Sequence, residues 1–280
     1  MRPVPKTRMC PNCRAFVPTS TRVCPYCEMQ LGPRAVDRRN PGEILGGLIP
    51  QFRFTTTLIL IINFAFYIAT AFKGGSFWNI PGETLYLFGA KIGLHFLNGQ
   101  WWRLVTAGFL HGGMLHILMN SWVLFDLGAE VEAAYGTARM IVFYLVSTVT
   151  GFFLSAWWSP GISIGASAGL MGLIGAMIAF SITERSAMAR SLRSQYVRWV
   201  IYIMLFGFII PGIDNAAHVG GAIGGFLTGL LLSTPRARLM WREPLIRFAA
   251  ACCVVITAGC FAIMFLNMPH AEQQLQLMGR

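Results

Sequence analysis

Long uncharged stretches alternate along the chain with segments that carry basic residues. The uncharged runs are residues 54–72, 140–183, 199–213 and 248–271. A membrane-spanning helix needs about 20 mostly apolar residues, so these runs are long enough to cross a bilayer. The pattern predicts seven spanning helices, near residues 55–73, 113–133, 138–157, 167–183, 195–210, 215–233 and 248–268. Residues 74–112 form a long loop rich in aromatic side chains, and we expect a loop of this length to pack or to function.

The composition supports a membrane protein. Of the 280 residues, 55% are hydrophobic and 12% are charged, and the mean hydropathy is +0.58. A soluble domain of this size usually carries about 25% charged residues. The composition therefore argues against a soluble enzyme and against a disordered chain, and it predicts an all-α polytopic membrane protein.

The charge is strongly basic and unevenly distributed. Lysine and arginine total 22 against 11 aspartate and glutamate residues, which gives a net charge of +11. Residues 1–54 carry nine basic and three acidic residues, so a charge of +6 precedes the first span. A basic segment can bind nucleic acid. Beside a span, however, the positive-inside bias and the attraction to anionic lipid explain the charge, and we expect no nucleic-acid partner.

The basic residues also predict the orientation of the spans. They follow the second, fourth and sixth spans, as Arg139, then Arg185, Arg190, Arg193 and Arg198, then Arg236, Arg238, Arg242 and Arg247. The links 158–166 and 211–214 carry no basic residue. The positive-inside rule then places the N-terminus in the cytoplasm and the C-terminus outside. We expect a multi-pass protein of a prokaryotic plasma membrane, embedded in the lipid bilayer.

Four cysteines near the start of the chain are spaced as a metal site. Cys10-Pro-Asn-Cys13 and Cys24-Pro-Tyr-Cys27 are two CxxC knuckles separated by ten residues. Four thiolates at this spacing can surround one tetrahedral Zn²⁺, whereas a cytoplasmic location disfavours the alternative of two disulfides. We predict a small structural Cys₄ zinc ribbon over residues 1–35, folded by its metal, and a linker over residues 36–54. One interpretation of the ribbon is a docking module for a protein partner.

Polar residues inside the predicted spans gather at one depth. Such residues are costly in a bilayer and indicate function by default. They are His116 and Asn120 on one face of the second span, Ser167 at the start of the fourth, and His218 near the start of the sixth. These three spans run in the same direction, so the four residues should lie at a similar depth, below the outer surface.

Small residues place a second constraint on the fourth and sixth spans. They recur every four residues, as Ala168, Gly172 and Ala176 in one span and as Ala217, Gly221, Gly225 and Gly229 in the other. Such stripes let two membrane helices approach each other backbone to backbone. If the stripes face each other, Ser167 and His218 come within reach.

A serine hydroxyl beside an imidazole is a nucleophile with its base. His218 would take the proton of Ser167, and the Ser167 amide, with the side chains of His116 and Asn120, would be candidate donors to an oxyanion. A lone serine at a helix start is usually a cap, and a lone histidine in a span can simply link helices. The four residues together favour a catalytic site. Asp214, one turn before His218, is interpreted as a helix cap, so we favour a dyad over a triad.

At these positions the chain resembles the rhomboid family of intramembrane serine proteases. The likeness covers residues 95–235 in the family's order. It consists of Trp102-Arg103, of His111, His116 and Asn120 in the pattern HxxxxHxxxN, of Glu132 and Gly136, of Gly165-Ala166-Ser167 at the GxSG motif, and of Ala217-His218, Gly221 and Gly225 in the pattern AHxxGxxxG. As a set these motifs are highly specific. Two positions depart from the family: Ala168 replaces a glycine, and Met171 stands where an aromatic residue often stacks on the histidine.

The resemblance implies a rhomboid-like six-helix bundle over residues 55–235 and one extra C-terminal helix within residues 236–280. It implies Ser167 as nucleophile, His218 as base, an oxyanion site from the Ser167 amide, His116 and Asn120, and no cofactor for catalysis. The expected function is an intramembrane serine endopeptidase that cleaves transmembrane protein substrates near the outer leaflet. The alternative is a catalytically inactive rhomboid-like protein that binds transmembrane helices. A transporter is a weaker rival, because the sequence shows no inverted repeat.

Overall fold

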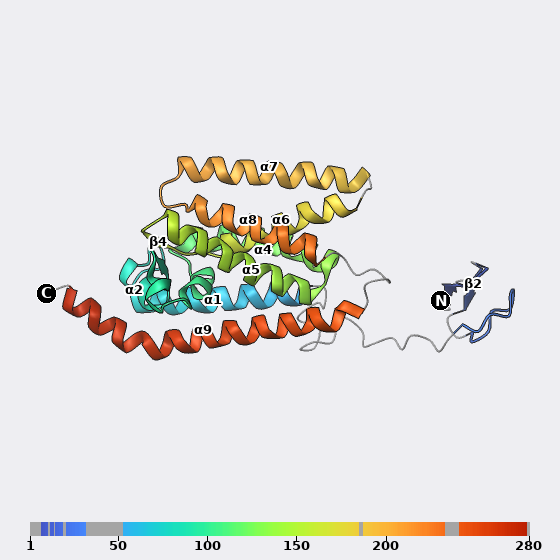
Figure 1. Cartoon of the computed structure of the whole chain (residues 1–280), viewed down its shortest axis with the longest axis horizontal. Helices are drawn as coiled ribbons and strands as arrows, with labels where there is room; N and C mark the ends of the chain where they lie inside the picture. Colours follow the sequence, from blue (N-terminus) through green and yellow to red (C-terminus); the bar gives the residue numbers. More distant parts are fainter. Residues whose placement is uncertain are drawn as a thin grey trace, which may run out of the picture. The chain divides into compact units, whose positions relative to one another are not determined.

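The structure, a computed structural model, describes residues 7–10, 12–13, 15–18, 21–31, 53–184, 187–232 and 241–278. The chain divides into two compact units, Met1–Gln51 and Phe52–Arg280, which are drawn in Figure 1. Most of the predicted linker over residues 36–54 lies outside the described residues, and so do Arg185, Arg236 and Arg238.

The first unit is a pair of short strands and a second turn that share a small core. Strand β1 (Thr7–Met9) pairs antiparallel with β2 (Phe16–Pro18), with Arg8 opposite Val17. The buried side chains of Cys10, Val17, Cys24 and Leu31 form the core of this unit. A core of this size cannot fold such a short segment by burial alone, so the unit needs a further source of stability.

The second unit is helical, and its long helices match the seven predicted spans in order. They are α1 (Phe54–Gly74), α4 (Met114–Tyr135), α5 (Thr137–Trp158), α6 (Ser167–Thr183), α7 (Ala187–Ile209), α8 (Asn215–Leu231) and α9 (Glu243–Met278). Helix α7 begins earlier than the predicted residue 195, and α9 continues past residue 268 through Pro269. Hydropathy marks where a helix leaves the apolar layer, whereas residues such as arginine and glutamine at these ends still favour helix.

Three of these helices are long and apolar enough to cross a membrane by length and composition alone. They are Phe54–Gly74, Thr137–Trp158 and the part of α9 from Glu243 to Gln273, and Ser167–Thr183 is a shorter apolar helix. The acidic residues of α4 and the arginines of α7 lower the hydropathy of those two helices. With nine helices in the described part of the chain, the structure confirms the prediction of an all-α polytopic membrane protein.

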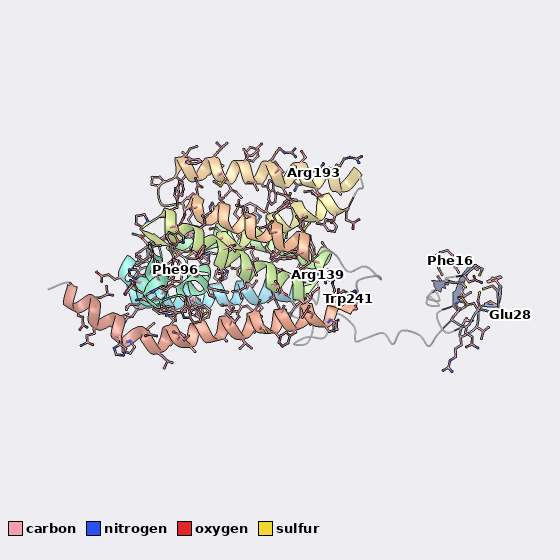
Figure 2. All side chains as sticks on the ribbon, in the orientation of Figure 1. Phe16, Glu28, Phe96, Arg139, Arg193 and Trp241 are labelled. Atoms are coloured by element: carbon pink, nitrogen blue, oxygen red, sulfur yellow. The ribbon has the colours of Figure 1, made fainter. Side chains whose placement is uncertain are left out.

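The long loop after α1 is folded, as its length and aromatic content predicted. It holds α2 (Gly82–Leu87), β3 (Lys91–Ile92), the 3₁₀ helix η3 (His95–Asn98), α3 (Arg103–Thr106) and a second 3₁₀ helix η4 (Ala107–Phe109). Arg103 organises it from within, because its buried guanidinium donates to the carbonyls of Tyr86 and Ala90 at 2.8 and 2.9 Å. Figure 2 shows Phe96, from this loop, at one end of the bundle and Arg139 and Trp241 at the other.

Helices α6 and α8 form the centre of the bundle, with α7 on one side and α9 on the other (Figure 1). The predicted stripes of small residues face each other. A Cβ atom placed on Gly221 would lie 2.1 Å from the carbonyl oxygen of Ala168, and one on Gly225 would lie 1.9 Å from that of Gly172. The two backbones therefore touch, as the spacing of the stripes allows.

The register of these contacts gives the direction of the two helices. The facing pairs rise together along both helices, from Ala168 with Gly221 through Gly172 with Gly225 to Ala176 with Gly229. Helices α6 and α8 are therefore parallel, which agrees with the predicted order of spans. Ser167 precedes Ala168 by one residue and His218 precedes Gly221 by three, so a rise of about 1.5 Å per residue sets them about 3 Å apart in depth.

Candidate active site

The start of α4 presents two of the predicted residues. The loop before it fixes this start, because the amides of Met114 and Ile80 donate to the carbonyls of Phe77 and Gly112 at 3.1 and 2.8 Å. His116 and Asn120 lie one turn apart on α4, as predicted, and Asn120 is buried. His111 is also buried, and its ring meets that of His116 edge to face with centroids 5.0 Å apart.

Both α4 side chains point at the loop that leads into α6. A Cβ atom placed on Gly165 would lie 2.7 Å from Nε2 of His116 and 3.6 Å from Nδ2 of Asn120. Gly165 has a φ of +123°, a conformation that disfavours any residue with a side chain. A glycine is thus required here both by its backbone and by the two polar groups that approach it.

The hydrogen bonds of these side chains indicate that both offer donors near Gly165. The Gly112 amide donates to Nδ1 of His116 at a long 3.5 Å, so a neutral His116 ring carries its hydrogen on Nε2. The buried Nδ2 of Asn120 has no hydrogen-bond partner among the described residues. An unpaired buried amide donor is costly, and a polar ligand beside Gly165 would satisfy it.

Ser167 begins α6 and is half-buried, with Ala166 as its cap residue. The loop before it is held in place by the Gly165 amide, which donates to the carbonyl of Ala107 at 2.9 Å. The first amides of a helix have no acceptor within the helix, and they attract negative charge. The hydroxyl of Ser167 therefore lies beside free N–H groups of its own helix.

His218 is 6% exposed and lies one turn into α8. Its buried Nδ1 has no hydrogen-bond partner in the described part of the chain. Ala217 beside it and Ala168 beside Ser167 belong to one small cluster of buried side chains. The structure thus brings the side chains of His116 and Asn120 to Gly165, two residues before Ser167. It also packs Ala168, which follows Ser167, with Ala217, which precedes His218.

Asp214 caps α8, as the sequence predicted. Its Oδ1 accepts a hydrogen bond from the Ala217 amide at 3.0 Å, and the hydroxyl of Ser155 donates to its other oxygen. The side chain therefore points at the start of its own helix and at the end of α5. This arrangement agrees with a role of Asp214 as a helix cap. It also agrees with a dyad, in which the Asp214 carboxylate does not orient His218.

The sequence pattern did not point to Lys91, which braces the frame of this site. It is 2% exposed, and its Nζ donates to the carbonyls of Ser159 at 2.7 Å and of Ser155 and Gly161 at 3.3 Å. A lysine suits this position, because the last carbonyls of a helix such as α5 attract positive charge. Burial lowers the pKa of Lys91, and the nearby Asp214 carboxylate opposes that shift. In the sequence, the only indication of this role is that Lys91 is the one lysine within the aromatic-rich loop.

Lys91 also connects the loop to the serine. Strand β3 pairs antiparallel with β4 (Ile162–Ser163), with Lys91 opposite Ser163, and β4 leads directly to Gly165 and Ser167. The same lysine thus fixes the end of α5 and the strand before the serine. The predicted polar residues depend on this frame for their position.

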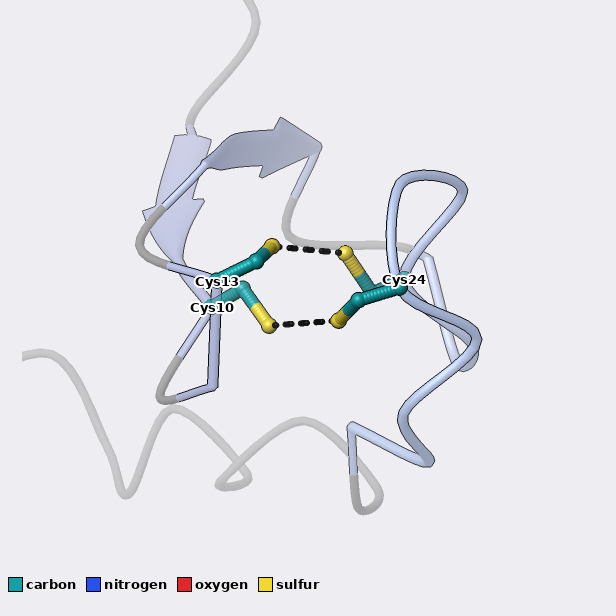
Figure 3. A group of neighbouring side chains, drawn as sticks. Cys10, Cys13 and Cys24 are labelled. Carbon is teal, nitrogen blue, oxygen red and sulfur yellow. Dashed lines mark hydrogen bonds between the residues drawn. The ribbon is translucent and has the colours of Figure 1, made fainter.

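Four cysteine sulfurs converge in the first unit (Figure 3). The Sγ atoms of Cys10, Cys13, Cys24 and Cys27 all lie within 4.8 Å of one another. Cys10 and Cys27 are 3.6 Å apart, and so are Cys13 and Cys24. These distances exclude disulfides, whose sulfurs lie about 2 Å apart. The four thiols could hold a metal ion.

Comparison with known proteins identifies the helical unit. The model of the family described as "Rhomboid domain" matches residues 98–235. Residues 98–235 are therefore similar to a rhomboid domain. This domain includes every predicted residue of the site, from His116 to His218, and all the helices that position them.

Several curated rhomboid proteins are similar to the chain. "Rhomboid protease GluP" of Bacillus subtilis (strain 168) is 33% identical over 221 residues, which are 79% of this chain and 42% of that protein. "Rhomboid-like protease 1" of Toxoplasma gondii is 28% identical over 251 residues, 86% of each chain. "Rhomboid protease AarA" of Providencia stuartii is 28% identical over 235 residues, 75% of this chain and 80% of that one. The chain thus spans less than half of the Bacillus protein and most of the other two.

The rhomboid domain accommodates both departures from the family's motifs. Ala168 and Met171 are buried in α6 at 0% and 1% exposure. A Cβ atom on Gly169, the glycine that follows Ala168, would lie 2.7 Å from the ring of Tyr144. Helix α5 thus approaches both residues closely: the ring of Tyr144 meets Gly169, and Gly151, which has no side chain, leaves room for the methyl group of Ala168.

Proposed function

We propose that the chain is an intramembrane serine endopeptidase of the rhomboid type, with Ser167 as nucleophile and His218 as its base. The observation that carries the proposal is the convergence at Gly165. Two side-chain donors of α4 point there, and the start of α6 with Ser167 follows two residues later. The rhomboid domain and the similar rhomboid proteases support the same function.

Each side chain has a role in acyl transfer. His218 takes the hydroxyl proton as the Ser167 oxygen attacks the substrate carbonyl, which forms the Oγ–C bond and a tetrahedral oxyanion. The Ser167 amide, Nε2 of His116 and Nδ2 of Asn120 donate to that oxyanion. The C–N bond then breaks, and the imidazolium protonates the leaving amine. Water, deprotonated by the same imidazole, releases the acyl group.

The substrate is a transmembrane protein segment, cut near the outer leaflet. The peptide bonds of a helix are hydrogen-bonded and sterically covered, so the segment must unwind before Ser167 can reach a carbonyl. We place the N-terminus in the cytoplasm and the C-terminus outside, because the arginines around α5, α7 and α9 gather at the end of the bundle away from Ser167. A prokaryotic plasma membrane is the proposed location.

Cleavage of reporter substrates by purified protein tests this proposal. Ser167→Ala should lower the cleavage rate of single-span reporters by about a thousandfold or more, because the nucleophile is lost. Ser181→Ala is the matched control, since Ser181 lies in the same helix and its hydroxyl donates to the carbonyl of Ile178, in its own helix. This control should keep its activity and its labelling by a fluorophosphonate probe. A folded wild type that binds transmembrane helices without cleavage or labelling would instead indicate an inactive binder.

We further propose that the four cysteines bind one structural Zn²⁺. Zn–S bonds of about 2.3 Å in a tetrahedron set the sulfurs about 3.8 Å apart, close to the observed 3.6 Å. A backbone hydrogen bond from Met29 lowers the pKa of Cys27 to about 6. A backbone hydrogen bond from Ala15 favours the thiolate of Cys13, yet burial and the other three cysteines raise its pKa to about 12. Four adjacent thiolates need a cation, which a zinc ion supplies together with the folding energy of the unit.

Metal analysis of the full chain tests the zinc proposal. Wild type should carry about one Zn²⁺ per chain, and Cys24→Ser should lose it because three thiolates bind far more weakly. Cys252→Ser, on a half-buried cysteine of α9, is the control and should keep the metal. Retention of zinc by Cys24→Ser, or iron in place of zinc in wild type, would contradict the proposal. For the role of the zinc ribbon, we propose that it docks a protein partner.

A further inference from the structure

A pocket lies at the end of the bundle opposite Ser167. It has a volume of about 520 Å³ and lies between the turn that joins α4 to α5 and the first turns of α9. Its walls include Arg139 and Arg247 at the polar end and Ile141, Ala251 and Val254 toward the membrane interior. The pocket is therefore amphipathic, with charge at one end and apolar surface at the other.

The charged end of the pocket carries an excess of positive charge. Arg139 pairs with both oxygens of Glu243, through NH2 to Oε1 at 2.6 Å and through NH1 to Oε2 at 3.1 Å. The side chain of Arg139 is 4% exposed, so this pair belongs to the wall. Arg247 is exposed at the rim. Two arginines stand against one glutamate in this lining, so one net positive charge remains for a ligand.

The start of α5 adds donors to the same end. Gly136, Thr137 and Ala138 line the pocket, and α5 begins at Thr137. The first amides of this long helix have no acceptor within the helix and lie at its positive end. Together with the guanidinium of Arg247 they make this end of the pocket suitable for a phosphate group.

The other end of the pocket faces the lipid side of the bundle. Ala251 and Val254 are exposed on α9, and only 17% of the residues in the most apolar window of α9 are buried. A soluble phosphate compound would leave this apolar half uncovered, whereas an acyl chain would cover it. The groove between α5 and α9 thus matches the two halves of a phospholipid.

We propose that this pocket binds one anionic phospholipid, with its phosphate between Arg247 and the start of α5 and an acyl chain along Ile141, Ala251 and Val254. A zwitterionic lipid fits less well. Its ammonium group needs a carboxylate, and both oxygens of Glu243 already accept from Arg139. The bound lipid would hold α9 against α5 at the basic end of the bundle, where anionic lipids attract arginine.

Native mass spectrometry of the delipidated full chain in detergent tests the proposal. Phosphatidylglycerol should bind with one tight site per chain and about tenfold more tightly than phosphatidylethanolamine. Arg247→Ala should weaken phosphatidylglycerol about tenfold, because a charge-assisted contact to phosphate is lost. Ala251→Trp should weaken both lipids, because the indole fills the apolar end of the groove.

Arg193→Ala is the matched control for general attraction of lipid to basic residues. Arg193 lies on α7, outside the pocket, and is labelled in Figure 2. This variant should bind phosphatidylglycerol as wild type does. Equal losses for Arg193→Ala and Arg247→Ala, equal affinities for the two lipids, or full competition by free glycerol phosphate would each overturn the proposal.

Discussion

Replacing Gly225 by alanine is expected to destabilise the protein and to abolish cleavage, although glycine-to-alanine changes normally stabilise a helix by about 1 kcal/mol. The new Cβ would lie 1.9 Å from the carbonyl oxygen of Gly172 and 2.5 Å from its Cα. Both partners are backbone atoms, so no side chain can rotate away. Helices α6 and α8 must separate, and overpacking of this kind costs about 3 kcal/mol. Thermal unfolding in detergent and reporter cleavage measure the two effects.

The change at Gly259 supplies the matched control. Gly259 lies in α9, and a Cβ atom there would meet no heavy atom within 4 Å. Gly259→Ala should therefore raise the melting temperature slightly and leave cleavage unchanged, since only helix propensity changes. The same glycine-to-alanine substitution is thus expected to lower the melting temperature at position 225 and to raise it at position 259. If Gly225→Ala is as stable and as active as wild type, the backbones of α6 and α8 are not in contact.

The stripes could be predicted from sequence because they depend on local spacing. Residues four apart share a helix face, so Gly221, Gly225 and Gly229 had to form one surface of their helix. The alternation of basic loops then fixed which spans run in parallel. The partner surface on α6 follows from the same two rules. This is why the depth of Ser167 and His218 could be predicted before any contact was known.

Contacts between distant segments could not be predicted in this way. Arg139 bonds to Glu243 across 104 residues and to the carbonyl of Leu232 across 93. Lys91 reaches the end of α5 from a loop in which local periodicity predicts no element. Such pairs are set by how the helices cross, and one sequence carries no record of that. The frame of the site, as opposed to its polar residues, therefore came only from the structure.

The acidic residues at the end of α4 combine a feature that can be predicted from sequence with one that cannot. Carboxylates near a membrane span need polar partners, and Glu132 accepts hydrogen bonds from two backbone amides. The nearer of these amides in space, that of Thr55, belongs to the start of α1, which is 77 residues away along the chain. Glu130 accepts instead from the hydroxyl of Tyr196, on α7. The type of interaction was predictable from charge and depth, whereas the partner helix was not.

Changing Glu132 to glutamine is expected to lower the free energy of unfolding by about 3 kcal/mol. The carboxylate is 5% exposed and accepts five hydrogen bonds. Four come from the amides and hydroxyls of Thr55 and Thr56, at 2.8 to 3.3 Å, and the fifth comes from the hydroxyl of Thr137 at 2.7 Å. Glutamine keeps the shape but turns one acceptor into a donor, which then faces other donors.

The measurement is the melting temperature in detergent, which should fall by roughly 6–12 °C for a loss of this size in a chain of this length. Asp126→Asn is the matched control, because Asp126 lies on the same helix and is exposed, and its stability should change by less than about 0.5 kcal/mol. Glu132 joins the starts of α1 and α5 to the end of α4, far from Ser167. The variant should therefore cleave normally at temperatures where it is folded. A stable variant with impaired cleavage would show instead that Glu132 acts on the site and not on the cap of α1.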